Sequence, residues 1–500
     1  MAAMIANDLI LAITQSAGGT RASVFDSQGR RQAETFIPLA RIYPAPGRVE
    51  LDPEDIWRDV LTVWRRALEM TKADDVAALT LATQADSFVL WDRETGRPLA
   101  NAIAATDRRG TERLAALVAQ GSGSLIEVRT GLNVETTSPA ANLSVLLDEI
   151  EGARDKASTG ALAFGTLDCF LLWRLSGRQR FRTEPSNAAR TMLYNIHMGR
   201  WDADLLDLFG IPDALLPEVR DSADKLGETD KEIYGRPIPI VGMLCDRQAA
   251  LIGHGCTDRD HMTLCLGDMG GEAALLANTG GSAIGSRNGL SATVAWRTRQ
   301  ETVFALEAGP YDAGSALRWL RDELRLVEDP RTFETLAKGL KSNGGVYMVP
   351  AFSGLGPPRR DPHARAAIYG LGPTSGPAEL ARAALESLCY QAHDMLAAMV
   401  SDGMGRPHRL HVDGALSRND WLLSFLADIL DIPVGRSAIP EAAAYGSFVL
   451  AGYVLGRYGQ WSHAPGPKDS GGVFQPRMTG TIRRSLLEGW YEALDKTRST

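Results

Sequence analysis

The sequence is poor in the features that mark extracellular and membrane proteins. Only 5 cysteines occur among 500 residues, at positions 169, 245, 256, 265 and 389, and none belongs to a CxxC pair. An odd, widely spaced set of thiols does not build a disulfide framework, which favours a reducing compartment. No apolar run reaches the length of about eighteen residues that a membrane-spanning helix needs. Residues 1–14 lack a basic segment, and Asn7 and Asp8 interrupt their apolar stretch, so we expect no secretory signal.

Positive charge is also in short supply. Lys and Arg total 53 against 61 Asp and Glu, which gives a formal net charge of −8. This balance excludes a nucleic-acid binder that relies on overall positive charge, although a local basic patch stays open. Apolar residues make up 44% and charged residues 23%, as in ordinary globular proteins. We expect a cytoplasmic globular protein of about two to four domains, with neither a membrane nor a nucleic acid as partner.

Strand-like and helix-like segments alternate along the whole chain, which is typical of an α/β fold. The apolar pattern predicts strands at 9–13, 21–25, 76–82, 238–244, 262–266 and 273–277, and helices that begin near Pro53, Asp246, Glu379 and Trp421. Asp52 is suited to cap the first of these helices, and Asn419 the last. Two α/β halves, each opened by a hairpin, account for this order. We place the halves at residues 1–253 and 254–500.

A series of sequence blocks occurs in one order along the chain: residues 43–50, 164–168, 187–193, 319–323, 349–356, 361–365 and 385–391. Together they resemble the FGGY family of carbohydrate kinases, and within it the glycerol kinases. The resemblance implies two ribonuclease-H-like domains of the actin/hexokinase superfamily, with ATP and sugar meeting in the cleft between them. It also implies an ATP-dependent kinase that acts on a small-molecule polyol, sugar or sugar acid, and it allows a homodimer.

Asp246 matches the catalytic aspartate of the family. It stands between a predicted buried strand and a predicted helix, where its carboxylate would face the cleft and accept the proton of the acceptor hydroxyl. The alternative is that Asp246 only caps the helix that follows it. The matching neighbours, Gly242 and residues 248–251, favour the base.

The phosphate-binding turns depart from the family pattern. The turn at 14–21 has Thr14 where the family has a magnesium-binding aspartate, and the turn at 267–272 has Asp268 in place of a threonine. Mg²⁺ prefers carboxylate and water oxygens, so relocated acids would replace the lost ligand. The resemblance then implies ATP contacts at Gly18, Gly19, Arg21, Asp268, Gly314, Arg318, Gly414, Ala415 and Asn419, and Mg²⁺ ligands at Asp246, Asp268 and Glu272. The alternative for the second turn is two solvated acids on a hairpin that binds no nucleotide.

The acceptor pocket departs further from the glycerol kinases. Their Arg-Glu pair becomes Ala85-Asp86, and a tryptophan, a tyrosine and a glutamine become Ala105, Thr137 and Arg247. The implied substrate contacts are Gln84, Asp86, Ala105, Thr137, Asp246 and Arg247. Because an arginine pairs well with carboxylate or phosphate, we expect a polyol, sugar or sugar acid other than glycerol. The alternative is a catalytically impaired relative that acts as a ligand sensor or binding protein.

Histidine and cysteine side chains suggest one rival site. His254, Cys256, His261 and Cys265 lie within a short segment, and His408 and His411 flank a predicted strand. The segment lacks the paired cysteine spacing of structural zinc sites, so we do not expect a metal centre there.

Overall fold

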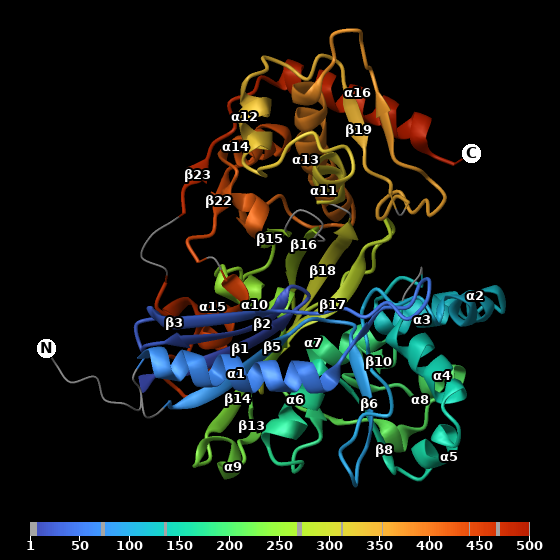
Figure 1. Cartoon of the computed structure of the whole chain (residues 1–500), viewed down its shortest axis with the longest axis vertical. Helices are drawn as coiled ribbons and strands as arrows, with labels where there is room; N and C mark the ends of the chain where they lie inside the picture. The colour runs from blue at the N-terminus through green and yellow to red at the C-terminus, as the bar shows by residue number, and fades with distance from the viewer. Residues whose placement is uncertain are drawn as a thin grey trace, which may run out of the picture.

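The computed structural model describes residues 8–71, 76–134, 138–267, 273–311, 314–352, 354–439, 441–466 and 471–499. The chain forms two α/β halves, drawn mainly in blue and green and mainly in yellow to red in Figure 1. The sheet of the first half has the strand order β13 (Lys225–Glu228), β14 (Pro239–Cys245), β5 (Ala78–Thr83), β1 (Ile10–Ser16), β2 (Gly19–Phe25) and β3 (Arg31–Pro38). The sheet of the second half has the order β17 (Ser291–Arg297), β18 (Thr302–Tyr311), β16 (Ala273–Gly280), β15 (Met262–Leu266), β21 (Leu410–Asp413), β22 (Val434–Arg436) and β23 (Val473–Phe474).

The two sheets share one topology. In the first, β1 pairs antiparallel with β2 and β2 with β3, while β5 and β14 are added in parallel on the other side of β1. In the second, β15 pairs antiparallel with β16 and β16 with β18, while β21 and β22 are added in parallel beyond β15. The predicted pair of α/β halves, each opened by a hairpin, is therefore confirmed.

The helices and minor strands surround these sheets. The helices are α1 (Pro53–Thr71), α2 (Thr111–Ala119), α3 (Gly123–Thr130), α4 (Pro139–Glu149), α5 (Ala153–Ser158), α6 (Leu167–Leu175), α7 (Pro185–Ala188), α8 (Ala203–Phe209), α9 (Lys231–Tyr234), α10 (Asp246–Gly253), α11 (Ser315–Asp322), α12 (Thr332–Lys338), α13 (Pro377–Ser401), α14 (Asp420–Leu430), α15 (Ala442–Val454) and α16 (Gly480–Thr497). A four-stranded sheet of the first half has the order β4 (Glu50–Leu51), β7 (Ala102–Ile103), β6 (Phe88–Asp92) and β8 (Leu162–Thr166). Three short strand pairs complete the fold: β10 (Tyr194–Asn195) with β11 (Arg200–Trp201), β12 (Glu218–Val219) with β9 (Arg182–Thr183), and β19 (Tyr347–Val349) with β20 (Ala367–Tyr369).

Local sequence signals account for where the helices begin. The Asp52 carboxylate accepts a hydrogen bond of 2.8 Å from the amide of Glu54 at the start of α1, and the Asn419 amide oxygen accepts one of 2.9 Å from Leu422 at the start of α14. These are the N-caps that the sequence predicts. The α1 residues at helical spacing, among them Val60 and Trp64, are buried against the first sheet.

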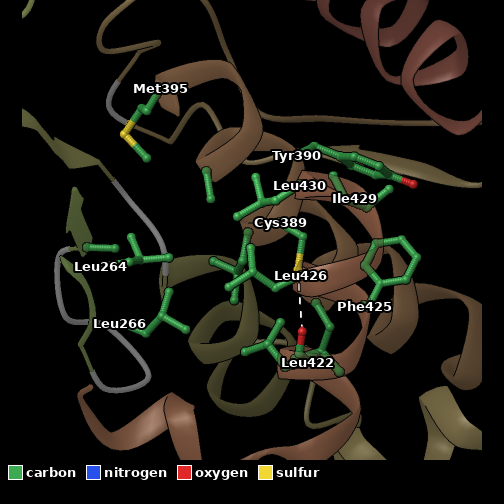
Figure 2. Packing of buried hydrophobic residues seen from close by; sticks show 14 of the residues in the cluster. Leu264, Leu266, Cys389, Tyr390, Met395, Leu422, Phe425, Leu426, Ile429 and Leu430 are labelled. Carbon is green, nitrogen blue, oxygen red and sulfur yellow. Dashed lines mark hydrogen bonds between the residues drawn. The ribbon is translucent and has the colours of Figure 1, made fainter. Parts of the chain in front are cut away.

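Figure 2 shows part of the core of the second half. Leu264 and Leu266 of β15 face helices α13 and α14, which pack against each other. The thiol of Cys389 on α13 donates a hydrogen bond of 3.7 Å to the carbonyl oxygen of Leu422 on α14. All five cysteines are free thiols, and four of them are buried. None of the helices in the described residues combines the length and apolar character that crossing a bilayer requires.

Helix α15 crosses from the second half of the chain to the first sheet. It packs on β1, β5 and β14 and lies beside α10, as Figure 1 shows. The two helices meet backbone to backbone: a Cβ at Gly446 would lie 1.7 Å from the Ala249 carbonyl oxygen, and one at Gly253 would lie 2.0 Å from the Ala442 carbonyl oxygen. The division of the chain at residues 253 and 254 stays a proposal. It does not describe α15, which belongs to the second half of the sequence but packs on the sheet of the first half.

This contact makes a prediction about stability. Gly446→Ala should lower the stability by about 1–3 kcal/mol or more, because the methyl group has no space between α15 and α10. Helix propensity alone would favour alanine by about 1 kcal/mol, so a loss of stability reports the clash. Urea unfolding measures the midpoint for the parent, Gly446→Ala and a control, Gly459→Ala, whose Cβ would have no neighbour within 4 Å. Equal midpoints for the two variants would contradict the close contact.

Candidate active site

A cleft of about 880 Å³ lies between the two halves. Parallel strands end at one edge of a sheet, and in both sheets that edge faces the cleft. The first half contributes Thr14 of β1, Gln84 after β5 and Asp246 after β14, while the second contributes Gly267 after β15 and Gly414 after β21. The topology therefore brings the ends of five strands, from two separate hairpin-led halves, to one cavity.

Asp246 is the first residue of α10 and lines the cleft. Its Oδ1 accepts a hydrogen bond of 2.8 Å from the backbone amide of Arg247. Burial raises the pKa of Asp246 to about 6; the charge and the amide of Arg247 oppose this rise, while Glu307 and Asp86 add to it. A carboxylate that is ionised at neutral pH and still basic enough to take a proton is suited to general base catalysis.

A network of four charged side chains lies beside Asp246: Arg190 and Glu307 are buried, while Asp86 and Arg247 are partly exposed. The guanidinium of Arg190 binds both oxygens of Asp86, with Nε–Oδ1 and Nη2–Oδ2 distances of 3.0 and 2.9 Å. Its Nη1 also donates to Oε2 of Glu307 at 3.1 Å, while Oε1 of Glu307 binds Nη1 of Arg247. Burial opposes ionisation of Glu307, but the two guanidinium groups outweigh it and hold its pKa below the usual range. Glu307 is therefore ionised at neutral pH although it is buried.

Two members of this network were not singled out by the sequence analysis. Arg190 falls in the block at 187–193 that carries the family resemblance, but no role was assigned to it. Glu307 is an acid inside the apolar run 303–308 of β18, and a lone charge in a buried strand is the signal that could have identified it.

The structure brings most of the residues predicted to contact the acceptor to one cleft. Gln84, Ala105, Asp246 and Arg247 line the cleft. The side chain of Gln84 donates a hydrogen bond of 3.0 Å to the side-chain oxygen of Gln15. Asp86 has a left-handed backbone (φ 66°) and joins the group through Arg190, and Thr137 lies outside the described residues.

Of the residues predicted to contact the nucleotide, only some line the cleft. Gly18, Gly414 and Ala415 line the cleft. Gly414 has a φ of 89°, and a Cβ there would lie 1.8 Å from the Leu266 carbonyl oxygen, so only glycine lets the ends of β15 and β21 approach this closely. Such a close turn presents backbone amides to an anion.

Other predicted nucleotide contacts have different surroundings. Arg21 is paired with Glu34 at 3.0 Å and with Glu441 at 2.8 Å, so its charge is already balanced. A Cβ at Gly19 would clash with the Ile37 carbonyl oxygen at 2.2 Å, which makes this glycine necessary for the β2–β3 pairing. Three further positions do not appear among the cleft-lining residues: Gly314 is buried at the N-cap of α11, Arg318 is exposed on α11, and Asn419 caps α14. Asp268 and Glu272 lie outside the described residues.

The segment that contains His254, Cys256, His261 and Cys265 is the rival metal site considered from the sequence. His254 forms a contact of 3.2 Å between its Nε2 and Oδ2 of Asp413, and its ring lies 5.7 Å from that of His411. Within the part of the chain that the structure describes, no three His, Cys, Asp or Glu side chains are arranged to hold a metal ion.

Two family models match this chain. The model of the FGGY family of carbohydrate kinases, N-terminal domain, matches residues 9–253, and the model of the C-terminal domain matches residues 275–455. A glycerol kinase of Rhodospirillum centenum is 45% identical, with 98% of each chain covered. A glycerol kinase of Rhizobium rhizogenes is 42% identical, with 98% of this chain and 99% of the relative covered.

Solved structures agree with these matches. The glycerol kinase of Plasmodium falciparum with ADP superposes with a TM-score of 0.91 at 27% identity, covering 98% of both chains. The gluconate kinase of Lactobacillus acidophilus has a TM-score of 0.85 at 19% identity, covering 98% of this chain and 97% of that one, which supports the fold alone. The two family models together span most of the chain, and both matched segments contribute residues to the cleft. The protein therefore belongs to the FGGY family of carbohydrate kinases.

Proposed function

We propose that this kinase transfers the γ-phosphoryl group of ATP to a hydroxyl of glycerol. The observation that carries the proposal is the position of Asp246, at the strand–helix junction beneath a cleft shared by the two halves. The choice of glycerol as the acceptor rests on the similar proteins, which are named glycerol kinase. A homodimer, which the resemblance allows, stays a prediction.

The expectation that the acceptor is not glycerol is wrong, as is the alternative of an impaired sensor. Relatives that are 39–45% identical over 98% of this chain are named glycerol kinase. The expectation treated Arg247 as a cation available to an acidic substrate. In the structure Glu307 binds this guanidinium, so its charge is balanced by the protein itself. Gln84 lines the cleft and is a polar group for a small polyol, and we propose the Asp86 carboxylate, which Arg190 holds, as the second.

Proton transfer is the chemistry that we assign to Asp246. Its carboxylate would accept the proton of the attacking hydroxyl while the oxygen of that hydroxyl forms a bond to the γ-phosphorus. The bond between the γ-phosphorus and the bridging oxygen breaks, and its electron pair leaves with ADP. Asp246 then releases the proton to solvent and is again a base.

ATP binding is the task that we assign to the second half. The glycine-bearing ends of β15 and β21, at Gly267 and Gly414, would receive the phosphates. Arg418 lines the same side of the cleft and adds positive charge there, whereas the neighbouring Arg436 is paired with Asp420. Enclosing the phosphates between two halves also excludes water from the transferred group.

The residues present fit a magnesium ion in this cleft. Oδ1 of Asp413 and Oγ1 of Thr14 are buried without a hydrogen-bond partner, and both residues line the cavity. We propose that Asp246 and Asp413 hold Mg²⁺, since this ion usually takes one or two carboxylates together with water and phosphate oxygens. When bound with ATP, Mg²⁺ neutralises phosphate charge and orients the transferred group. Asp268 and Glu272 stay predictions for the same role.

The first test measures turnover. We expect the parent to release ADP when supplied with glycerol and Mg·ATP. Asp246→Asn should lower kcat by about 10²–10⁴-fold, because the proposed base is lost together with one proposed Mg²⁺ ligand. Calorimetry should show that Asp246→Asn still binds glycerol. A control, Asp155→Asn, changes an exposed acid in the first turn of α5 and should keep full activity. A parent that binds glycerol and ATP but releases no ADP would sink the proposal.

The raised pKa of Asp246 gives a pH dependence with a definite sign. The base is protonated below its pKa of about 6, so kcat/KM should fall by about tenfold per pH unit below this value and level off above it. Arg247→Gln should move this limb to higher pH, since the guanidinium lowers the pKa of Asp246. The phosphates of ATP ionise in the same range, so the shift between parent and variant is the informative quantity. A control, Arg484→Gln on α16, should leave the limb unchanged, and a downward shift in Arg247→Gln would contradict the assignment.

The magnesium assignment is tested by binding rather than turnover. Calorimetry gives the affinity for ADP with and without millimolar Mg²⁺, and the parent should bind ADP more tightly with the ion. Asp413→Asn should lose most of this gain, while the control Glu441→Gln, whose carboxylate lines the same cleft but is paired with Arg21, should keep it. Asp268→Asn and Glu272→Gln test the acids that the sequence suggests. An undiminished gain in Asp413→Asn would exclude Asp413 as a ligand.

A further inference from the structure

Glu307 belongs to the second half of the fold, whereas the acceptor pocket belongs to the first. Both ion pairs of Glu307 are nevertheless made with arginines of the first half. It lies on β18 in the sheet of the second half, whereas Arg190 and Arg247 come from the first half. Its side chain is 1% exposed and accepts from Arg190 with Oε2 and from Arg247 with Oε1. Both carboxylate oxygens are therefore engaged by guanidinium groups across the interface between the halves.

Arg190 passes this restraint on to Asp86. Its Nε and Nη2 hold the two oxygens of Asp86 in a bidentate pair, while its remaining Nη1 is held by Glu307. A guanidinium is planar, so fixing one end of it fixes the plane in which the other end meets the second carboxylate. The position of the Asp86 carboxylate thus depends on Glu307, which it does not touch.

Arg247 depends on the same carboxylate. Its backbone amide binds Asp246, and its side chain extends to Glu307. The charge of this guanidinium also acts on Asp246, where it lowers the pKa of the carboxyl group. Glu307 therefore balances the charge of a cation that acts on the base, and restrains where that cation lies.

The four charges balance only as a set. Asp86 and Glu307 are negative, and Arg190 and Arg247 are positive, and the Arg190 side chain is only 10% exposed. Removing one charge from a buried balanced group leaves its partners uncompensated, and they then seek new partners in the pocket. A change at Glu307 should consequently reshape the acceptor pocket without altering any residue that we assign to it.

We propose that Glu307 is a positioning residue for the acceptor: it belongs to the nucleotide half and, through Arg190 and Arg247, holds Asp86 and the space beside Asp246 in the arrangement that binds a polyol. The inference rests on the proposed function, because it takes glycerol as the acceptor. It goes beyond that function in assigning the shape of the acceptor pocket to a side chain of the opposite half.

The experiment compares two buried glutamates of the second half. Glu307→Gln keeps the size of the side chain and removes the charge. Its control is Glu386→Gln on α13, where a buried carboxylate pairs with Arg382 and accepts a hydrogen bond from Tyr390. Because Glu386 does not line the cleft, the two variants share the loss of a buried charge and differ in its place. Thermal unfolding identifies the destabilisation that they have in common.

The expected result is a selective loss of acceptor binding. Glycerol affinity, measured by calorimetry without nucleotide, should fall by about tenfold or more in Glu307→Gln and remain unchanged in Glu386→Gln. The KM for glycerol should rise in parallel, while the KM for ATP changes by less than about twofold. Glu307→Asp, which retains the charge on a shorter side chain, should recover part of the affinity, and Arg190→Lys, which cannot make the bidentate pair, should reproduce the loss.

The outcomes separate this inference from the proposed function. If the parent binds glycerol and turns it over, and Glu307→Gln has the glycerol affinity of Glu386→Gln, the positioning role is wrong. If Glu307→Gln weakens glycerol and ATP equally, the residue is merely structural and the inference also fails. If the parent neither binds nor phosphorylates glycerol, the proposed function fails on its own account, and the inference falls with it.

Discussion

A buried carboxylate of the second half, Glu307, is ion-paired with two arginines of the first half beside the proposed active site. Glu307 is surrounded by protein and would be costly to ionise alone, but Arg190 and Arg247 keep it charged. Each of the three side chains needs the others, since a buried charge without its partner is strongly unfavourable. Burial raises the pKa of Asp246, and these charges adjust it: Arg247 lowers it, and Glu307 raises it.

The second constraint is topological. Each half places two parallel strands beside its opening hairpin, and the residues that follow parallel strands meet at a common edge. In this way Thr14, Gln84 and Asp246, which are far apart in the chain, share one wall of the cleft, while Gly267 and Gly414 share the other. Helix α15 then packs through Gly446 against α10, so Asp246, the base that we propose, lies at the start of a closely packed helix.

The departures in the phosphate turns have a physical meaning in this setting. Thr14 has a buried hydroxyl with no partner where the family has an acid, and Asp413 has a carboxylate oxygen in the same condition. Both residues line the cleft, so an ion or ligand bound there can supply the contact that the protein itself does not. Arg21 shows the opposite case: two glutamates balance its charge, and its role as a phosphate contact stays a prediction.

Local patterns in the sequence were enough to predict the alternation of strands and helices, the hairpin that opens each half, the caps at Asp52 and Asn419, and the place of Asp246 at a strand–helix junction. These features follow from local periodicity, turn chemistry and sequence blocks, which need no knowledge of distant partners. Only the tertiary structure decided which charges meet. Arg247 looked like a cation for an acidic substrate until Glu307, 60 residues away and on the other sheet, was found to bind it. Pairing between residues that are remote in the chain depends on how two sheets face each other, and no local pattern encodes that arrangement.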